Sequence, residues 1–278
     1  MKKSTRLFAL IAALALVVAA CGDDSGGGGS GDTTADGFPD LGGQNVTVGV
    51  ENLYLPFNYI PLGETEGEGW DYDAWTEICK LLNCEAEFVE AGWPAVIDQV
   101  AQGDLDTAAD GISITDERKE IVDYSDAYMV VQQKFVMQAG DDRYTSAQDV
   151  IDSDAIVGTQ VGTTNYELAE SLVGADRIDA FDQFPLAIQA LIAGDVDVVM
   201  IDDAAGLGYI GANADKIETI DDGLQSDPLG FIFPPGSDLV GPVNQAIAEL
   251  KDNGVFDALG VKYFGEDFDL GYDEIVGG

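Results

Sequence analysis

IDQVAQGDLDTAAD at 97–110 and IQALIAGDVDVVMI at 188–201 are the two stretches that decide the fold. They align at an offset of 91 residues, and each predicts a helix that a glycine ends, a turn with aspartates, and then an apolar strand. Two similar α/β units are therefore expected. We expect the aspartates at turn and solvent positions, because the oxygen-rich spacing of a calcium loop is absent. The matched positions are Gly103 and Gly194, Asp104 and Asp195, and Asp106 and Asp197.

Strands and helices alternate around these two stretches. The predicted strands cover 45–51, 85–90, 106–111, 155–159 and 196–201. The predicted helices cover 71–83, 94–102, 163–172, 185–193, 243–250 and 256–264. Such an alternation predicts parallel sheets that are covered by helices. A chain of 278 residues is long enough for two lobes of this kind, each with a core of its own.

The charge of the chain excludes a nucleic-acid partner. The sequence holds 12 Lys and Arg against 52 Asp and Glu, for a net charge of −40, and such a surface repels phosphate. It contains no histidine, which excludes Ser-His-Asp and Cys-His catalysis and every zinc site that uses imidazole. An apolar content of 46% argues against global disorder.

The amino terminus is typical of an export signal. Three basic residues precede the apolar run 7–18, which is too short for a membrane-spanning helix. Small residues then lead to Cys21, an order that resembles the lipobox of bacterial lipoproteins. We interpret 1–20 as a signal peptide and Cys21 as a lipidated residue; an ordinary secretory signal with a stray cysteine is the alternative. The Gly-rich stretch 21–44 predicts a flexible tether.

Two further cysteines, Cys79 and Cys84, lie five residues apart in EICKLLNC. In an exported chain, a disulfide that closes a short loop at a helix end is the favoured interpretation. Two buried free thiols are the alternative. A metal site is not expected, because no histidine or other cysteine of the body is available to complete it.

Several polar residues follow predicted strands, where parallel sheets bind ligands. Thr163 and Thr164 can cap the helix that follows them, or present its N–H groups to a carboxylate or phosphate. Arg118, one of few basic residues, could form a surface ion pair or hold a carboxylate with both edges of its guanidinium. Asp202 could cap the next helix or meet a cation. Glu51 follows the first strand.

Seven blocks of the sequence carry a resemblance to a known family. They are VGVENLYLPF, GxDYDxWxEICKLLN from Gly69, FVEAGWPAVIDQVAQGDLD, DGISITDERKEIVDYSDAY, VGTQVGTT, GDVDVVMID and DNGVFDALGVKYFG. Over about residues 44–265 the chain resembles the bacterial extracellular solute-binding proteins of family 3, which serve polar amino-acid ABC transporters. The most specific block is SITDERK followed by DYSDAY.

The resemblance implies a set of ligand-binding residues. The family arginine that holds the α-carboxylate of the ligand corresponds to Arg118. The carboxylate that receives the α-ammonium group corresponds to Asp202. The remaining counterparts are Gly111 and Ser113 for backbone and hydroxyl contacts, Thr163 and Thr164 for the carboxylate cradle, Tyr54 for the stacking aromatic, and Trp93 for an apolar contact. In the family a disulfide also follows the helix that holds Cys79.

Two acidic residues bear on specificity. Position 110 is usually small or hydroxylic in the family, and here it is Asp110. Glu51 lies where members that take basic amino acids carry an acid. If both face the cleft, the side-chain pocket is anionic and favours a cationic group such as that of Lys, Arg or ornithine. The alternative is that both point to solvent in a chain that is rich in acids everywhere.

The resemblance implies a two-lobed α/β fold of the periplasmic-binding-protein type II. Each lobe would be a mostly parallel sheet flanked by helices, and two strands would form the hinge. We expect 45–130 and 230–278 to form lobe one and 131–229 to form lobe two. The crossing strands are expected near 128–135 and 227–233.

The implied function is that of a lipid-anchored, exported protein that closes on a basic or polar amino acid for an ABC transporter. Its expected partners are this ligand, the permease and, through Cys21, the membrane; a monomer without metal or cofactor is expected. One alternative is a related zwitterion such as ectoine or glutamine. Others are a sensory subunit with the same site and an enzyme resembling cyclohexadienyl dehydratases, which needs a general acid or base and is disfavoured by the intact Arg118 and Asp202.

Overall fold

The structure is a computed structural model that describes residues 33–211, 213–265 and 268. The expected signal peptide, the lipidated Cys21 and the first part of the tether lie outside the described residues. Among the residues described, none of the helices combines the length and apolar character that crossing a bilayer requires.

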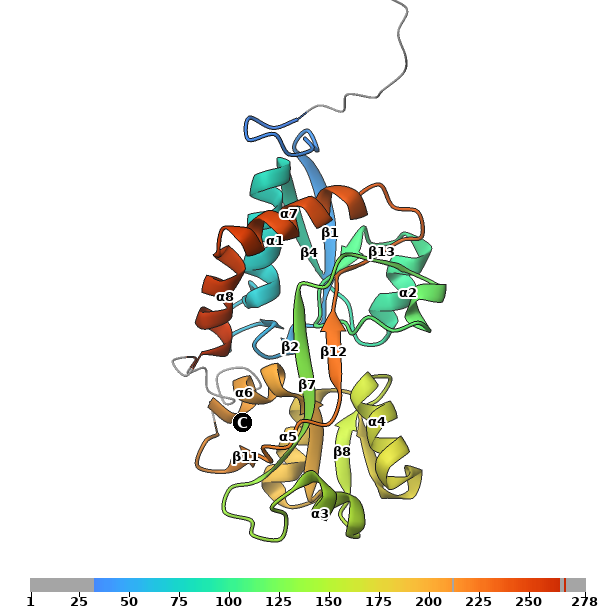
Figure 1. Cartoon of the computed structure of the whole chain (residues 1–278), viewed down its shortest axis with the longest axis vertical. Coiled ribbons are helices and arrows are strands. Elements are labelled where there is room, and N and C mark those ends of the chain that lie inside the picture. Colours follow the sequence, from blue (N-terminus) through green and yellow to red (C-terminus); the bar gives the residue numbers. More distant parts are fainter. Residues whose placement is uncertain (1–32, 212, 266–267, 269–278) are drawn as a thin grey trace, which may run out of the picture. The chain divides into compact units, whose positions relative to one another are not determined.

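The first lobe is built on a five-stranded sheet with the order β4-β1-β5-β13-β6. Its parallel core pairs β1 with β4 and β5, while β13 runs antiparallel to β5 and β6. Figure 1 shows α1, α7 and α8 on one side of this sheet and α2 on the other. The bounds are β1 Gln44–Val50, β4 Cys84–Glu90, β5 Thr107–Ala108, β6 Asp123–Tyr124, β13 Ile232–Phe233, α1 Trp70–Leu82, α2 Ala95–Gln102, α7 Val240–Asp252 and α8 Val255–Phe264.

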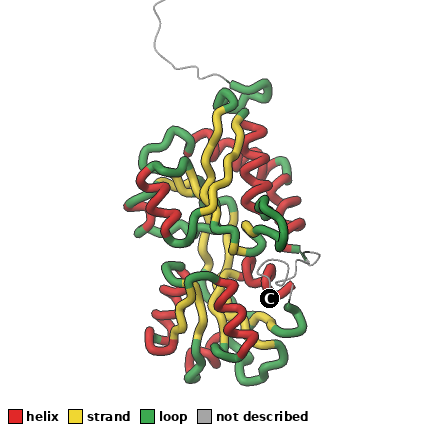
Figure 2. The backbone as a smooth tube through the Cα atoms, turned by 180° about the vertical axis from the view of Figure 1, so that it is seen from behind, coloured by secondary structure: helices red, strands yellow, loops and turns green. Residues whose placement is uncertain are grey.

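The second lobe is built on a six-stranded sheet with the order β11-β7-β10-β8-β9, and β12 pairs with β7. Strands β8, β9 and β10 are parallel, and the pairs with β7 are antiparallel. Helices flank the strands of both sheets in the view from behind (Figure 2). The bounds are β7 Met129–Gln138, β8 Val157–Gln160, β9 Ile178–Phe181, β10 Val198–Asp202, β11 Ile217–Thr219, β12 Ser226–Leu229, α3 Ala147–Asp152, α4 Thr164–Val173, α5 Phe184–Ala193 and α6 Asp203–Gly211.

The remaining elements are short. A hairpin of β2 and β3 follows β1, and two single-turn 3₁₀ helices precede β6 and β9. Their bounds are β2 Leu53–Tyr54, β3 Asn58–Tyr59, η1 Arg118–Glu120 and η2 Ala175–Arg177. The hairpin and η1 matter for function, because they carry residues of the pocket described below.

The repeated sequence stretch forms the same turn once in each lobe. Helices α2 and α5 both end at a left-handed glycine, Gly103 with φ 77° and Gly194 with φ 82°. An aspartate after each glycine then accepts a backbone N–H from a residue in, or directly before, a neighbouring strand. The pairs are Asp106 with Thr47 at 2.8 Å and Asp197 with Ile156 at 2.9 Å. These aspartates therefore join strands, and the described residues hold no acidic or cysteine cluster suited to a metal.

Strands β7 and β12 link the two sheets (Figure 1). They are antiparallel neighbours, with Gln132 opposite Ser226 and Met129 opposite Leu229. The expected single strand over 227–233 is divided into β12 and β13, because pairing changes there from β7 to the first sheet. At this change the Phe231 N–H donates to the Ser125 hydroxyl at 3.0 Å. The two-lobed fold with a two-strand connection is confirmed.

The strand expected over 106–111 is wrong in length. Only Thr107 and Ala108 form β5, because the chain then turns through Gly111, which has a φ of 56°. The left-handed conformation ends the strand pairing and directs residues 110–113 toward the pocket. The other expected strands and helices are present, with ends displaced by a few residues.

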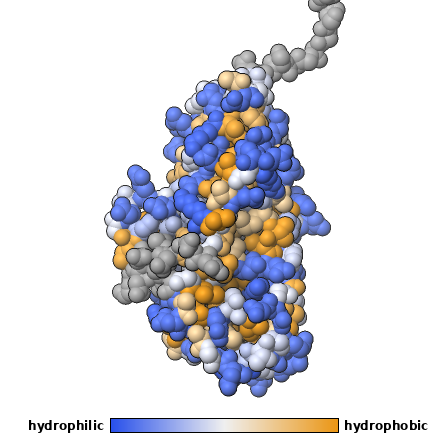
Figure 3. Space-filling view, turned by 60° about the vertical axis from the view of Figure 1, so that its left-hand side comes forward, coloured by the Kyte–Doolittle hydropathy of each residue, from blue (hydrophilic) through white to orange (hydrophobic). Residues whose placement is uncertain are grey.

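Stability comes from the buried core rather than from surface charge. The rings of Trp70 and Tyr128 stack with their centroids 4.7 Å apart, and those of Tyr128 and Phe231 stack with their centroids 4.5 Å apart. Burying such a side chain contributes about 1.5–3 kcal/mol each. The ion pairs found among the described residues all have a basic partner more than half exposed, and exposed pairs contribute about 0–1 kcal/mol. Figure 3 shows hydrophilic residues over most of one face, with apolar residues gathered near its middle.

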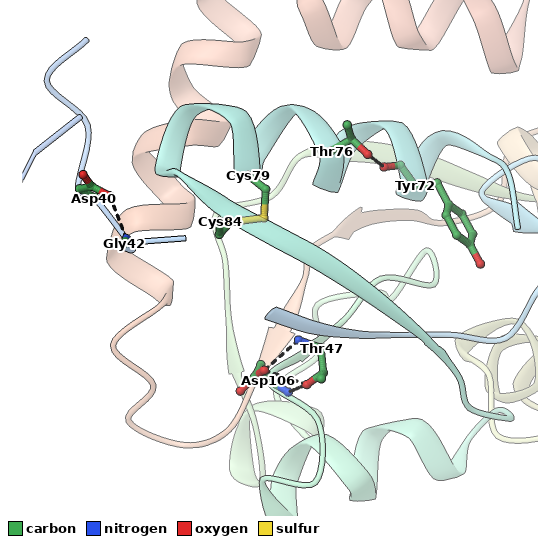
Figure 4. The surroundings of a disulfide bond; sticks show 8 residues. All are labelled: Asp40, Gly42, Thr47, Tyr72, Thr76, Cys79, Cys84 and Asp106. Carbon is green, nitrogen blue, oxygen red and sulfur yellow. Dashed lines mark hydrogen bonds between the residues drawn. A yellow bond between two sulfur atoms is a disulfide. The ribbon is translucent and has the colours of Figure 1, made fainter. Parts of the chain in front are cut away.

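The predicted disulfide between Cys79 and Cys84 is confirmed. It joins the last turn of α1 to the first residue of β4 (Figure 4). Between them, Asn83 caps the helix in a left-handed conformation, with φ 52°. The bond therefore closes the tight turn between a helix and a strand of the first lobe.

The end of the expected tether is not a free coil. The Leu41 N–H donates to the Leu82 carbonyl at 2.8 Å, and the Asn83 amide donates to Asp40 at 2.6 Å. Phe38 and Leu41 pack against the core of the first lobe. These two apolar side chains, absent from the Gly-rich part, give this end of the segment something to bury.

Candidate functional site

A pocket between the two lobes brings together all ten residues that the sequence singled out for ligand binding. Thirteen residues line it. Seven belong to the first lobe: Glu51, Tyr54, Trp93, Asp110, Gly111, Ser113 and Arg118. Six belong to the second lobe: Gln160, Thr163, Thr164, Asn165, Phe184 and Asp202. Their contact with a ligand stays a prediction.

The pocket lies where strands of both sheets end. Glu51 follows β1, Asp110 follows β5 by one residue, and Asp202 is the last residue of β10. Parallel strands open onto a crevice at their carboxyl ends, so these carboxylates converge on one place. Gly111 is required at its position, because a Cβ there would lie 2.6 Å from the Tyr54 ring.

Arg118 is held in place by groups that leave its charge unneutralised. Its guanidinium donates to two backbone carbonyls, Ser113 at 3.1 Å and Gly162 at 3.3 Å. It lies over the Trp93 ring at 4.9 Å from the ring centroid, a cation–π contact. Because carbonyls and a ring carry no formal charge, the guanidinium keeps a full positive charge at the pocket. It is the only cation among the residues that line it.

The amino end of α4 faces the same pocket. Thr163 is the N-cap residue, and its hydroxyl accepts the Tyr166 N–H at 3.0 Å. Thr164 starts the helix, and its hydroxyl lies 3.2 Å from that of Ser113 in the other lobe. Free N–H groups and the helix dipole give this end a partial positive charge. With Arg118 it forms an electropositive corner in an otherwise acidic pocket.

Asp202 lies opposite, buried at 2% exposure. Its carboxylate accepts the Tyr54 hydroxyl and the Asn165 amide, both at 2.9 Å. Burial raises the pKa of Asp202 to about 6, although both hydrogen bonds lower it. A cation that reached this carboxylate would remove the cost of burying its charge.

Glu51 and Asp110 form a second acidic group, which we call the acid pair. Both residues are buried, at 6% and 5% exposure, and both line the pocket; their contact with a ligand side chain stays a prediction. Burial raises the pKa of Glu51 to about 8, with Asp110 as the second cause. Burial likewise raises the pKa of Asp110 to about 7, against hydrogen bonds that lower it.

Aromatic rings line the rest of the pocket. Tyr54 stacks on Phe57 and on Phe184, with ring centroids 5.3 and 5.4 Å apart. Phe184 starts α5 and is 2% exposed. Tyr54 therefore uses its ring against protein rings and its hydroxyl against Asp202, so its expected stacking on the ligand stays a prediction.

A family model for bacterial extracellular solute-binding proteins, family 3, matches residues 46–266, which include both lobes and the whole pocket. The chain belongs to this family.

Relatives of this family 3 protein bind several different amino acids. It is 28% identical over 272 residues to the L-cystine-binding protein TcyA of Bacillus subtilis, covering 96% of this chain and 99% of the relative. Among solved structures it is similar to the arginine-, lysine-, histidine-binding protein ArtJ of Geobacillus stearothermophilus. That similarity is 30% identity over 80% of this chain and 95% of the other, with a TM-score of 0.73.

A third similar structure is the ancestral amino acid-binding protein AncCDT-1, a precursor of cyclohexadienyl dehydratase. It is 30% identical over 79% of this chain and 95% of its own, with a TM-score of 0.73. The fold of the family 3 protein is thus that of type II binding proteins.

Three residues of the pocket were not predicted from the sequence: Gln160, Asn165 and Phe184. Gln160 ends β8, three residues before the cap residue Thr163. A polar residue at a strand end is the signal that identified Asp202, and the same signal could have identified Gln160 as a pocket residue. Phe184 lies one residue before the helix expected over 185–193, and only the packing of α5 against β2 reveals its place at the pocket.

Proposed function

We propose that the protein captures a polar or basic amino acid between its lobes and delivers it to an ABC transporter for uptake. One observation carries this proposal: Arg118 of the first lobe and Asp202 of the second line the same pocket with opposite charges. An α-amino acid presents a carboxylate and an ammonium group on one carbon, and both charges find a partner here. The family membership of the chain and its amino-acid-binding relatives support it.

Each of the ten lining residues that the sequence predicted has a role in this proposal. Arg118, Thr163 and Thr164 hold the α-carboxylate, with Gly111 and Ser113 adding backbone and hydroxyl contacts. Asp202 receives the α-ammonium group. The remaining roles are Tyr54 as the residue that orients Asp202, Trp93 as an apolar wall, and Glu51 and Asp110 as contacts to the side chain.

Capture requires the lobes to move, and we propose that 45–130 with 230–278 moves as one body against 131–229. Contacts from both lobes to one ligand stabilise only the closed form, so the ligand shifts the population toward closure. Four hydrogen bonds or close polar contacts already join the two sides of the pocket, among them Tyr54 to Asp202 and Gln160 to Glu51. The closed form is then the one that the permease recognises.

The sequence also supports a proposal for the location. We propose that residues 1–20 direct export and that lipidated Cys21 holds a monomeric protein at the outer face of the cytoplasmic membrane. Cys21→Ala is expected to move the protein from the membrane fraction to the soluble exported fraction, and size-exclusion chromatography of a chain starting after Cys21 should give one monomeric peak. Retention of the variant in the membrane fraction would contradict the anchor.

Two other functions fit the same fold. A compact zwitterion such as ectoine, or glutamine, could occupy the pocket in place of a basic amino acid. A dehydratase like that named for the ancestral neighbour needs an acid or base aimed at a substrate ring, and we propose that the protein is not an enzyme. Absence of turnover with prephenate and arogenate is expected, and product formation would establish the enzyme instead.

The test of the proposed function is Arg118→Ala. Removing the cation that faces the ligand carboxylate leaves that charge buried without a partner, which costs about 2–4 kcal/mol of binding, or a 30- to 1000-fold loss of affinity. Isothermal titration calorimetry measures the affinity for amino acids, and thermal unfolding shows that the variant is folded. Lys119→Ala, one residue along and exposed, is the matched control. Unchanged affinity in Arg118→Ala would show that the site is elsewhere.

A further inference from the structure

The two lobes also meet at a place outside the ligand pocket, which we call the closing contact. Here α6 of the second lobe packs against the hairpin of β2 and β3 and lies next to the end of α8 (Figure 1). It consists of Gly208, Tyr209 and Gly211 in α6, Leu53, Leu55 and Pro56 in the hairpin, and Phe268 after α8. None of these residues is among those that line the ligand pocket.

Tyr209 is the centre of the closing contact. Its side chain is fully buried, and its hydroxyl donates to the Leu53 carbonyl of the first lobe at 2.7 Å. Tyr209 and Leu55 also belong to one apolar cluster, which includes the core residues of the first lobe. Both the polar and the apolar part of this tyrosine are therefore buried between the lobes, with no ligand involved.

Two glycines let α6 approach the first lobe closely. A Cβ at Gly208 would lie 3.1 Å from the Leu55 Cβ, and a Cβ at Gly211 would lie 2.8 Å from the Phe268 carbonyl oxygen. Neither glycine has a positive φ, so the space and not the backbone angle requires glycine there. The face of α6 thus fits the first lobe at two successive turns of the helix.

Phe268 connects the end of α6 to the first lobe. Its ring faces the rings of Tyr59 and Tyr263, with centroids 6.2 and 6.3 Å away. Both of these rings belong to the first lobe, whereas the Phe268 carbonyl faces Gly211 of the second. The aromatic contacts therefore hold this backbone carbonyl against α6.

The closing contact cannot outlast the closed arrangement of the lobes. Leu53 and Tyr54 are the two residues of β2, and Tyr54 bonds Asp202 across the pocket at 2.9 Å. Asp202 ends β10, and α6 begins at the next residue. Because the two interlobe hydrogen bonds join the same adjacent elements, a movement that separates Tyr54 from Asp202 also separates Leu53 from Tyr209.

We propose that the closing contact holds a fraction of the ligand-free protein in the closed arrangement, so that part of the free energy of closure is independent of the amino acid. This inference rests on the lobe closure of the proposed function. The hydrogen bond and the buried apolar surface form in the same way whichever ligand is bound. Since apparent affinity scales with the population of the binding-competent form, the contact strengthens the binding of every ligand by one common factor.

The ligand-free protein provides the direct test. Dyes on Asp98 in α2 and Glu170 in α4, two exposed positions in different lobes, report the distance between the lobes by single-molecule energy transfer. The wild type without ligand should show a closed population next to an open one. Tyr209→Phe should lower the closed-to-open ratio about 2- to 10-fold, as expected for one neutral hydrogen bond. Phe268→Ala should lower it at least about twofold, because the carbonyl loses its aromatic anchor.

Two matched variants serve as controls. Tyr263→Phe also removes a buried tyrosine hydroxyl, but one that bonds Asp73 within the first lobe. Val261→Ala shortens a side chain of α8 that is 73% exposed. Both should leave the closed-to-open ratio unchanged. Melting temperatures establish that all four variants are folded.

Calorimetric titration with arginine, lysine, glutamine and histidine gives the second readout. For each of these that the wild type binds, Tyr209→Phe should weaken affinity by the same factor, up to about tenfold, and keep the order of preference. A pocket residue would change the affinities by different factors. A changed preference in Tyr209→Phe would therefore contradict a role outside the pocket.

Two results in the ligand-free protein would overturn the closing contact. One is a wild type with no closed population, and the other is an unchanged closed-to-open ratio in both Tyr209→Phe and Phe268→Ala. If amino acids bind and close the wild type while these variants behave like it, the proposed function stands and the closing contact fails. If no amino acid binds or shifts the populations but the variants open the ligand-free protein, the proposed function fails and the closing contact stands.

Discussion

At the residue scale, Asp202 shows how the fold prepares a buried carboxylate to meet a cation. Its two hydrogen bonds come from opposite sides of the pocket, the Tyr54 hydroxyl from the first lobe and the Asn165 amide from the second. Both lower its pKa against the effect of burial. Tyr54 is also fixed by its stacking on Phe57 and Phe184, so the orientation of one carboxylate depends on an aromatic cluster.

Tyr54→Phe separates these two contributions, because phenylalanine keeps the stacking and removes only the hydroxyl. We expect amino-acid affinity to fall about 5- to 30-fold, corresponding to the loss of one hydrogen bond to a charged group. Calorimetric titration measures this, and the melting temperature should change little. Tyr263→Phe removes a hydroxyl that bonds Asp73 outside the pocket and serves as the control. Equal affinities in the two variants would show that Tyr54 does not orient Asp202.

The acid pair should lower the stability of the ligand-free protein at alkaline pH. Burial raises the pKa values of Glu51 and Asp110 to about 8 and 7, so the folded protein holds protons that the unfolded chain releases near pH 4. Between pH 4 and 8 the folded state binds more protons, and the free energy of unfolding therefore falls as pH rises.

Glu51→Gln and Asp110→Asn remove this penalty. Each is expected to raise the free energy of unfolding by about 1–2 kcal/mol at pH 8, because one pKa unit corresponds to about 1.4 kcal/mol, and to bring no gain at pH 4. Urea unfolding at both pH values measures the difference, with Glu64→Gln as the control. Variants that are less stable than the wild type at pH 8 would contradict the assigned direction of the pKa shifts.

Sequence reasoning identified ten of the thirteen pocket residues because their signals are local. A charged or hydroxylic residue at a strand end, or at the first turn of a helix, is visible in one stretch of chain. Gln160 was missed although its place at a strand end is such a local signal. Asn58 was not predicted because its importance lies in a hydrogen bond to Asp110, 52 positions away, and no local pattern reports this contact.

At the element scale, α6 shows how closely the lobes approach. Gly208 lies in this second-lobe helix, and a Cβ there would meet Pro56 of the first lobe at 3.0 Å. The Pro56 carbonyl accepts the Trp70 N–H at the start of α1, so Pro56 cannot move away independently of its lobe. Glycine at 208 is therefore needed because it leaves room for the two lobes to close, and not because the backbone there has a special angle.

Gly208→Ala should act as a wedge between the lobes. Alanine favours a helix over glycine by about 1 kcal/mol, so the variant should melt at the same or a higher temperature. Its affinity for the amino acid is nevertheless expected to fall at least about tenfold, because the closed state must accommodate the added methyl group. Gly206→Ala in the same helix is the control, since its Cβ would make only ordinary contacts at 3.5 and 3.6 Å. Equal binding by both variants would contradict this account of closure.

The repeated helix-to-strand turn was predictable because it is encoded in consecutive residues. Gly103 and Gly194 end their helices as expected. The division of the chain between β12 and β13 was not predicted, because the residues after Asp227 up to Phe233 are all apolar except Gly230. What divides it is the change of pairing partner between two sheets, a property of the tertiary fold.

At the scale of the whole molecule, the large negative charge and the pocket have separate causes. A net charge of −40 is far more than three pocket carboxylates can account for. Most acids are exposed, and salt screens repulsion between such charges beyond about 8–10 Å. The scarcity of basic residues is more informative, because Arg118 is the one cation among the residues that line the pocket and is the residue that we propose holds the ligand carboxylate.

The central claim is that Arg118 and Asp202, one from each lobe, hold the two charged groups of a single amino acid. A crystal structure of the protein grown with arginine tests it most directly. The account predicts the ligand α-carboxylate on the Arg118 guanidinium, its α-ammonium on the Asp202 carboxylate, and its side chain between Glu51 and Asp110. A ligand bound elsewhere, or bound here with its carboxylate away from Arg118, would contradict the claim.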